Sequence, residues 1–287
     1  MVDSRIQKLE NDIRDRISRI VADNSSWCLP RYNALQKIRE LDRYAFLCGG
    51  AVRDILLANR QNSIVPRDLD IVLGYIEVEK VADSFSDSNK KWNCYGGVSV
   101  QLKDWSIDVW SLNKTWAFVE KHVEGKGFSD FPKTTFLDIE AVAVQLFCRK
   151  LQKRKIYSKG FFEAILKKTI EINLEENPNP NTCIIRSLNV AKRFKFAIGP
   201  KLAKFIAHHA RQTDLEELWK LYQIRYKLDL LTFENFYLCI KAIEEQLRIS
   251  NRQPVKLPTQ EIQKYFQPVL WSNLVQKNTE GMLLQRI

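Results

Sequence analysis

The chain has 287 residues, of which 45% are hydrophobic and 28% charged, a balance typical of globular proteins. Its apolar runs are all shorter than the roughly 20 residues that span a bilayer, and its first residues lead into a charged stretch, so we expect neither a membrane association nor a secretory signal. The six cysteines are scattered without a C-x-x-C pair, which favours reduced thiols and predicts a cytoplasmic protein.

The net charge of +11 is unevenly placed along the chain. Residues 1–140 carry 20 Lys and Arg against 21 Asp and Glu, whereas residues 141–287 carry 25 against 13. A basic half joined to a near-neutral half indicates a polyanionic partner such as RNA. A solvated, lysine-rich helical surface would give the same count, so charge alone leaves both interpretations open.

The predicted elements change character along the chain. Apolar spacings of three and four predict helices over 5–21 and 31–41. Short β-branched and aromatic runs between glycines then predict a helix over 52–58 and strands over 45–48, 69–73, 98–102 and 107–110. From about residue 134 the periodicity predicts helix almost to the end. The expected fold class is therefore α+β, a small mixed sheet followed by helices.

Two carboxylates share one predicted strand. Asp68 and Asp70 are two residues apart, so they point to the same face while Leu69 and Ile71 point to the core. Neighbouring carboxylates repel unless a cation lies between them, and Mg²⁺ prefers carboxylate and phosphate oxygens. An exposed edge strand produces the same pattern by chance, so this pair is a weak signal when taken alone.

A glycine pair precedes these acids. Gly49 and Gly50 lie between a predicted strand and a predicted helix, where the backbone can approach a ligand and the first N–H groups of the helix favour an anion. Arg53 is placed to reach phosphate oxygens with its planar guanidinium, and Asp54 is placed to hold Arg53 or the glycine turn. The alternative is an ordinary tight turn with a surface Arg–Asp pair.

A third carboxylate, Asp108, lies in the predicted strand over 107–110 between apolar neighbours. A lone acid in a strand is usually solvent-facing. If its strand joins the same sheet, however, Asp108 completes a set of three carboxylates with Asp68 and Asp70. Such a set can hold one or two metal ions that activate an attacking oxygen and stabilise a leaving pyrophosphate.

These motifs resemble a known family. Residues 49–54 (GGAVRD) and 67–71 (RDLDI) resemble the head domain of bacterial-type CCA-adding tRNA nucleotidyltransferases and poly(A) polymerases, in the polymerase-β-like superfamily. Residues 95–100 and 107–109 are similar to the family's strand pair that bears the third acid, and residues 184–196 resemble its neck helix. The resemblance covers residues 44–200. Residues 136–144 are a degraded form of the family's next motif.

The resemblance implies a domain plan and an activity. The plan is N-terminal helices at 1–43, a nucleotidyltransferase head at 44–133, a helical neck at 134–200 and a basic helical domain at 201–287. The activity is Mg²⁺-dependent transfer of a nucleoside monophosphate from an NTP to an RNA 3′ hydroxyl, possibly that of tRNA, with release of pyrophosphate. The oligomeric state is not predicted.

The resemblance also implies roles for individual residues. Asp68, Asp70 and Asp108 would bind Mg²⁺ and act on the attacking hydroxyl. The expected nucleotide-binding residues come from three segments and are Gly49, Gly50, Arg53, Asp54, Arg67 and Arg186.

Some positions depart from the family pattern. Thr134 and Thr135 stand near the place of the family's sugar-contacting Arg-Asp pair, and residues 179–183 lack its base-reading E-D-x-x-R motif. We therefore do not expect the CCA template. Two alternatives stay open, a nucleotidyltransferase that modifies a protein or small molecule and a catalytically silent RNA-binding protein. A basic run, Lys150, Lys153, Arg154 and Lys155, is expected near the head–neck junction as a solvated helix face or an RNA contact.

Overall fold

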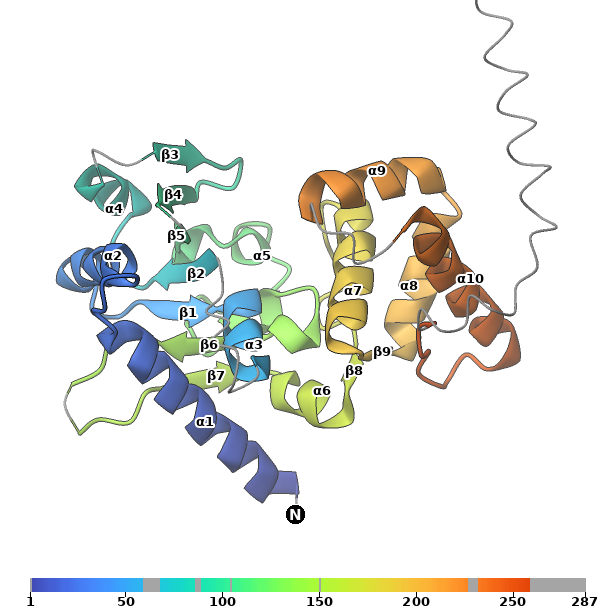
Figure 1. Cartoon of the computed structure of the whole chain (residues 1–287), viewed down its shortest axis with the longest axis horizontal. Coiled ribbons are helices and arrows are strands. Elements are labelled where there is room, and N and C mark those ends of the chain that lie inside the picture. The colour runs from blue at the N-terminus through green and yellow to red at the C-terminus, as the bar shows by residue number, and fades with distance from the viewer. Residues whose placement is uncertain are drawn as a thin grey trace, which may run out of the picture.

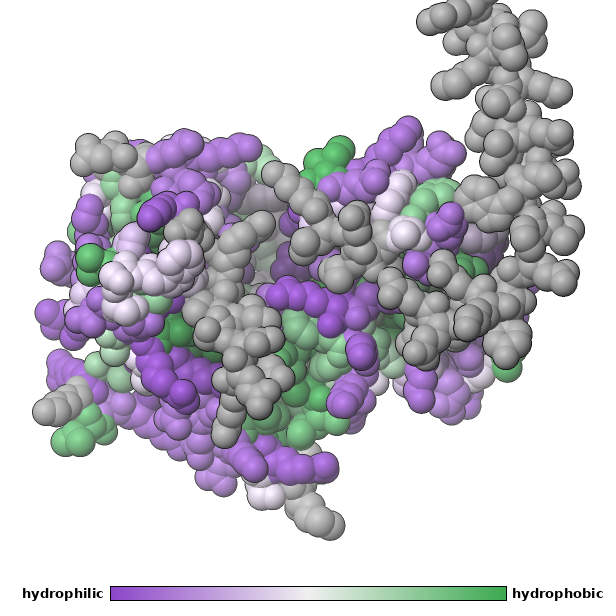
Figure 2. Space-filling view, viewed as in Figure 1, coloured by the Kyte–Doolittle hydropathy of each residue, from purple (hydrophilic) through white to green (hydrophobic). Residues whose placement is uncertain are grey.

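The computed structural model describes residues 2–58, 68–85, 89–103, 105–149, 151–226 and 232–258. Figure 1 shows a sheet with helices packed on it at the left, a bundle of helices at the right, and α7 between the two. Hydrophilic side chains cover most of the face in Figure 2, with hydrophobic ones gathered around α6. Within the described ranges, no helix is both long and apolar enough to cross a membrane.

The sheet at the left has seven strands in the order β3-β4-β5-β2-β1-β6-β7. β2 and β5 run parallel, and the other neighbouring pairs of these described strands run antiparallel. The strands are β1 (Phe46–Cys48), β2 (Asp68–Leu73), β3 (Asn89–Trp92), β4 (Val98–Leu102), β5 (Trp105–Ser111), β6 (Val142–Gln145) and β7 (Ile156–Ser158).

Helices cover one face of this sheet with their apolar stripes. They are α1 (Val2–Ala22), α2 (Leu29–Leu41), α3 (Gly49–Leu57) and α4 (Val78–Ser84). The opposite face carries a smaller aromatic cluster that includes Phe46, Phe128 and Phe131, together with the short α5 (Trp116–Val119). Single turns of 3₁₀ helix occur at Leu112–Lys114, Phe131–Thr134 and Asp138–Glu140.

The helical part follows the sheet in the chain. It contains α6 (Phe161–Lys167), α7 (Pro180–Phe194), α8 (Pro200–Ala210), α9 (Leu215–Tyr226), α10 (Phe233–Ile249) and a parallel pair, β8 (Thr169–Ile170) and β9 (Ala197–Ile198). α7 begins where Pro180 follows Asn179, whose side chain caps the helix by accepting from the Thr182 N–H at 3.1 Å. It ends at Lys195, which is left-handed at φ 56°.

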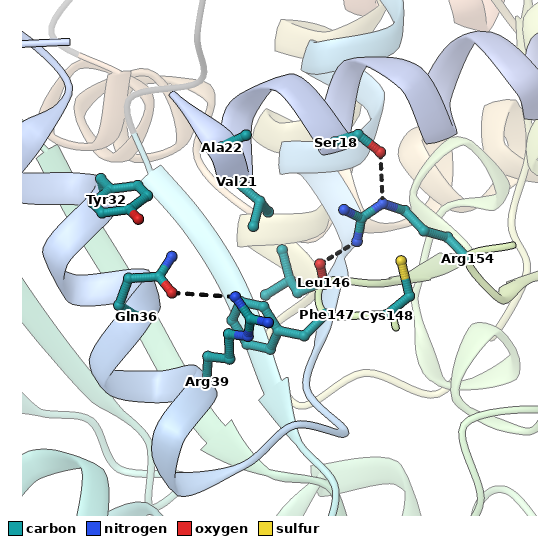
Figure 3. Close-up of a pocket in the computed structure, with 10 residues that line it drawn as sticks. All are labelled: Ser18, Val21, Ala22, Tyr32, Gln36, Arg39, Leu146, Phe147, Cys148 and Arg154. Carbon is teal, nitrogen blue, oxygen red and sulfur yellow. Dashed lines mark hydrogen bonds between the residues drawn. The ribbon is translucent and has the colours of Figure 1, made fainter. Parts of the chain in front are cut away.

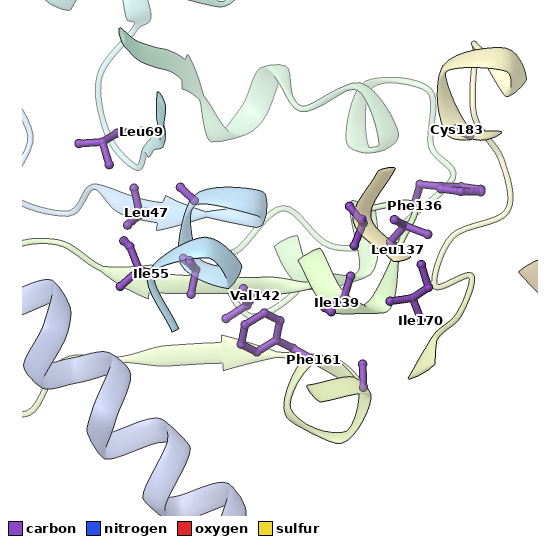
Figure 4. Packing of buried hydrophobic residues seen from close by; sticks show 14 of the residues in the cluster. Leu47, Ile55, Leu69, Phe136, Leu137, Ile139, Val142, Phe161, Ile170 and Cys183 are labelled. Carbon is purple, nitrogen blue, oxygen red and sulfur yellow. The ribbon is translucent and has the colours of Figure 1, made fainter. Parts of the chain in front are cut away.

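One hydrophobic core joins the sheet to the helical part. Figure 4 shows side chains such as Leu47, Leu69 and Val142 in line with Phe136 and Cys183 at the start of α7. Because this core is continuous, α7 is packed firmly against the sheet side of the molecule.

The expected helices and strands before residue 134 are confirmed, and so is the α+β class. The prediction of helix from residue 134 is wrong at residues 142–158, which contain β6 and β7, and at residues 169–179, which contain β8 and no helix. The β6 sequence VAVQ is too short to show a period, and its pairing partner β1 lies almost a hundred residues earlier. Consequently, the described part of the basic run lies in the β6–β7 connection beside α1, and Arg154 is buried there rather than solvated.

Substitution of Ile71 tests whether β2 is buried in the hydrophobic core. Its side chain is fully buried in β2, so Ile71→Ala should lower the free energy of unfolding by about 2–5 kcal/mol through lost contacts and a residual cavity. Ile224 in α9 is 75% exposed, and Ile224→Ala should change it by less than about 0.5 kcal/mol. Urea unfolding of both variants measures the difference; equal losses would contradict the assigned core.

Candidate active site

The strand register brings the predicted carboxylates together. In the parallel pair of β2 and β5, Asp70 lies opposite Asp108, and Asp68 lies opposite Ser106. Burial alternates along both strands, with Leu69, Ile71 and Ile107 in the core and the acids on the other face. All three carboxylates therefore share one face of the sheet, as the period of two required.

A serine supports the third acid. Ser99 in β4 lies opposite Asp108, and its hydroxyl donates a hydrogen bond to the Asp108 carboxylate. The Ser99 hydroxyl thus fixes the orientation of the Asp108 side chain from the neighbouring strand. The sequence motif over 95–100 contained this serine, but its contact follows from the strand pairing.

The glycine turn faces these acids. Gly49 has φ +63°, a left-handed conformation that favours glycine, and a Cβ at this position would lie 3.8 Å from the Asp70 Oδ2. At Gly50 a Cβ would lie 3.3 Å from the Arg53 Nη2 and 3.6 Å from both the Arg186 Nη2 and the Glu140 Oε1. Both glycines therefore let the start of α3 lie close to charged side chains.

Glu140 is the acid to which two arginines converge. The residue is 4% exposed; the Arg53 Nη1 donates to Oε1, and the Arg186 Nε lies 2.8 Å from Oε2. Arg53 also pairs with Asp54 at 2.7 Å, and the other oxygen of Asp54 pairs with Arg193 at 2.8 Å. This chain of ion pairs connects α3 and the 3₁₀ turn before β6 to α7.

The charges of this cluster shift one another's pKa. Burial would raise the pKa of Glu140, but Arg186 and Arg53 outweigh burial and hold it below its ordinary value. In turn, Glu140 raises the pKa of Arg186 further above its ordinary value. Glu140 and Arg186 are therefore both ionised at neutral pH. Glu140 was not among the residues predicted from the sequence; the sole available signal was its position in the degraded motif over 136–144.

A cavity of about 280 Å³ opens beside these groups, and its lining includes Asp70 on the acid face of the sheet and residues within 182–186 of α7. The predicted residues Gly49, Gly50, Asp70 and Arg186 line it. Thr135 lines it as well, and so do Thr182 and Cys183, which belong to residues 179–183, where the family's base-reading motif is absent. The remaining lining residues are Cys48, Trp110, Phe131, Phe136, Glu140 and Asn177.

Other predicted residues stand apart from the cavity lining. Arg53 and Asp54 are committed to the ion pairs around Glu140 and do not line it. Asp68 and Asp108 share the acid face with Asp70 without lining it. Arg67 lies outside the described residues.

Asp70 is the acid most affected by this setting. Burial raises its pKa to about 7, with further contributions from Asp108, Glu140 and Asp68, although Arg186 opposes them. A hard divalent cation bound beside Asp70 would offset the repulsion between this carboxylate and its acidic neighbours. Mg²⁺ therefore fits the donor set of Asp70 and Asp108, with Asp68 beside them. Within the described ranges, no three His, Cys, Asp or Glu side chains form a preassembled metal cluster, so the three-acid site remains a proposal.

Solved structures show where this architecture occurs elsewhere. A CCA-adding enzyme in an apo form matches with a TM-score of 0.55 and 18% identity over 83% of this chain and 54% of the other. A tRNA-processing enzyme complex matches with a TM-score of 0.54 and 16% identity, over 75% of this chain and 57% of the other. A CCA-adding enzyme with CTP matches with a TM-score of 0.51 and 23% identity, over 72% of this chain and 47% of the other. This chain shares the fold of CCA-adding enzymes.

The other comparisons find nothing: no protein-family model and no curated protein matches this chain. The chain also spans less than two thirds of the length of each of the three structures above. At these identities the likeness establishes the fold. The activity has to be argued from the residues of the site.

The raised pKa of Asp70 predicts a pH-dependent stability. Between about pH 4 and 7 the folded protein holds a proton on Asp70 that the unfolded chain releases, so stability should fall as pH rises through this window, by up to about 4 kcal/mol. Asp70→Asn should remove the contribution of Asp70 to this slope and make the metal-free protein more stable than wild type above pH 7. Thermal unfolding from pH 4 to 8.5 in EDTA measures both effects.

Asp138 provides the control for this measurement. Burial also raises its pKa to about 7, yet it does not line the cavity. Asp138→Asn should therefore flatten the same pH window but leave any stabilisation by Mg²⁺ intact, whereas Asp70→Asn should reduce it. A metal-free Asp70→Asn variant that is less stable than wild type at pH 8 would contradict the raised pKa.

Removal of the Glu140 charge should destabilise the protein strongly. Glu140→Gln leaves two arginines facing an uncharged amide in a buried site, which should cost about 3–5 kcal/mol in urea unfolding. Glu79, which pairs with Lys114 at the surface, is the matched control, and Glu79→Gln should have little effect because water screens that pair. A similar decrease in the free energy of unfolding of both variants would rule out a central structural role for Glu140.

Proposed function

We propose that this protein is a nucleotidyltransferase that transfers a nucleoside monophosphate from an NTP to a hydroxyl of RNA. The observation that carries the proposal is the register of β2 and β5, which pairs Asp70 with Asp108 beside a glycine turn that opens a helix. A carboxylate set next to backbone N–H groups matches the two demands of phosphoryl transfer, cation binding and phosphate positioning.

In this proposal each group in the site has a distinct task. Asp70 and Asp108, with Asp68, would hold Mg²⁺, and the bound ion would supply charge neutralisation for the phosphates and for the attacking hydroxyl. The first N–H groups of α3 receive the triphosphate. Arg186 lines the cavity and adds a positive charge close to Gly50. Arg53 acts indirectly, because its guanidinium holds Glu140 and Asp54 in place.

The bound base would lie toward the start of α7. Thr135, Thr182 and Cys183 line that side of the cavity, where the resemblance placed the missing sugar- and base-reading residues. These side chains are smaller than arginine and uncharged, so they cannot offer the bidentate contacts of a guanidinium. The nucleotide preference should therefore differ from that of a template built on an acid and an arginine.

RNA is the favoured acceptor because the second half of the chain carries most of the positive charge. The structures of similar fold include a CCA-adding enzyme with ATP, at a TM-score of 0.51 and 18% identity, and enzymes described as tRNA-processing. tRNA is thus the first RNA to test. Modification of a protein or small molecule is the second candidate, favoured by the altered base-reading positions.

Incubation with each labelled NTP in turn, Mg²⁺ and total cellular RNA tests the proposal. Label should enter RNA, and Asp68→Ala/Asp70→Ala should reduce incorporation by about a thousandfold or more, since metal and charge stabilisation are lost together. Asp83→Ala, which removes an exposed acid of α4, is the matched control and should retain full activity.

The outcomes separate the candidates. Label in a protein or small-molecule fraction, lost in the double variant, would replace RNA as the acceptor. Incorporation that survives in the double variant would contradict the assigned carboxylates. Salt-dependent RNA binding without incorporation into any fraction would favour a silent RNA-binding protein.

A further inference from the structure

A second cavity, of about 300 Å³, lies on the helix-covered side of the molecule. Figure 3 shows it between α1, α2 and the segment that follows β6. None of the residues that line it lines the cavity beside Asp70. The two sites are therefore separate, and binding of a ligand in the second cavity does not depend on the proposed transferase activity.

Arg154 is a buried cation in the wall of this cavity. It is 8% exposed, and its hydrogen bonds go to neutral acceptors: Nε donates to the Ser18 Oγ at 3.0 Å, and Nη1 donates to the carbonyl oxygens of Gln145, at 2.9 Å, and Leu146. Among the described residues, no carboxylate lies within 4.0 Å of it. Buried charges are ordinarily paired, so this guanidinium lacks the anion that its burial calls for.

The geometry leaves part of Arg154 available to a ligand. Its third nitrogen, Nη2, makes no hydrogen bond with a described residue, and in Figure 3 it lies on the side of the guanidinium nearer Val21. The protein contacts therefore fix the guanidinium plane and leave one edge toward the cavity. A fixed planar donor with a free edge is well suited to bind an oxyanion.

A second arginine stands at the rim of the same cavity. Arg39 in α2 is exposed, and its Nη1 donates to the Gln36 Oε1 at 3.4 Å, a long hydrogen bond that a charged ligand can replace. Tyr32 adds a hydroxyl, while Val21 and Phe147 add apolar surface. The lining contains two arginines and no carboxylate.

From this arrangement we infer that the cavity binds a small phosphate ester. The phosphate group lies between Arg154 and Arg39, and the remainder of the molecule packs on the apolar wall. Two guanidinium groups match the double negative charge of a phosphate monoester, and the volume is at the lower end of the range for small-molecule sites. A bound phosphate supplies the counter-charge that the described part of the protein does not give Arg154.

Calorimetric titration of the full chain with ribose 5-phosphate, at constant ionic strength, tests the inference. The wild type should bind, and Arg39→Gln should weaken binding about tenfold or more because one charge-assisted contact is lost. Arg43→Gln is the matched control: it removes an equal charge from an exposed residue four positions away, outside the cavity, and should bind like wild type. Arg154→Lys should also weaken binding, and Arg39 keeps the test valid if that buried variant does not fold.

Five results would overturn the inference. The first three are no binding by the wild type, equal weakening by Arg39→Gln and Arg43→Gln, and comparable binding of ribose or acetate. The fourth is binding of a short RNA without terminal phosphates in place of the free ester, which would assign the arginines to an RNA backbone phosphate. Retained binding in Arg39→Gln would place the ester elsewhere on the molecule and contradict the site.

Discussion

The structure depends on one constraint, the parallel pairing of β2 with β5. A parallel pair sets residues side by side in register, so Asp70 meets Asp108 and their side chains leave the sheet on the same face. A slip of β5 by one residue would turn Asp108 into the hydrophobic core and expose Ile107. The apolar residues that alternate with the acids therefore secure the site: burial of Leu69, Ile71 and Ile107 fixes where the carboxylates point.

The site contains charges of opposite effect on stability. Asp70 has a raised pKa, so its ionised form destabilises the folded protein at neutral pH in the absence of a cation. Glu140 has a lowered pKa, because two arginines surround it, and its ionised form holds the sheet side against α7. The cavity is therefore lined by one acid with a raised pKa, Asp70, and by one acid that is paired with two arginines, Glu140.

The sequence was most informative where the interactions are local. The period of two in β2, the glycine pair and the amphipathic spacing of α1 each follow from neighbours within a few residues. Pairings across long stretches of chain were not accessible: β6 joins β1, and Glu140 joins Arg53 and Arg186, 87 and 46 residues away. Glu140 also has no distinctive spacing of its own. The role of a lone buried acid can be recognised only when the structure shows which side chains surround it.

The ion pairs around Glu140 also limit how a nucleotide could bind. Arg53 is 7% exposed, holds Glu140 and Asp54, and lies with its guanidinium 5.2 Å from the Phe194 ring, so its donors and its face are already used. A triphosphate at the glycine turn would therefore rely on backbone N–H groups and on Arg186, which is 36% exposed at its side chain. Because Glu140 repels phosphate while it orients Arg186, affinity for an NTP should depend on the cation at Asp70 more strongly than in a site with free arginines.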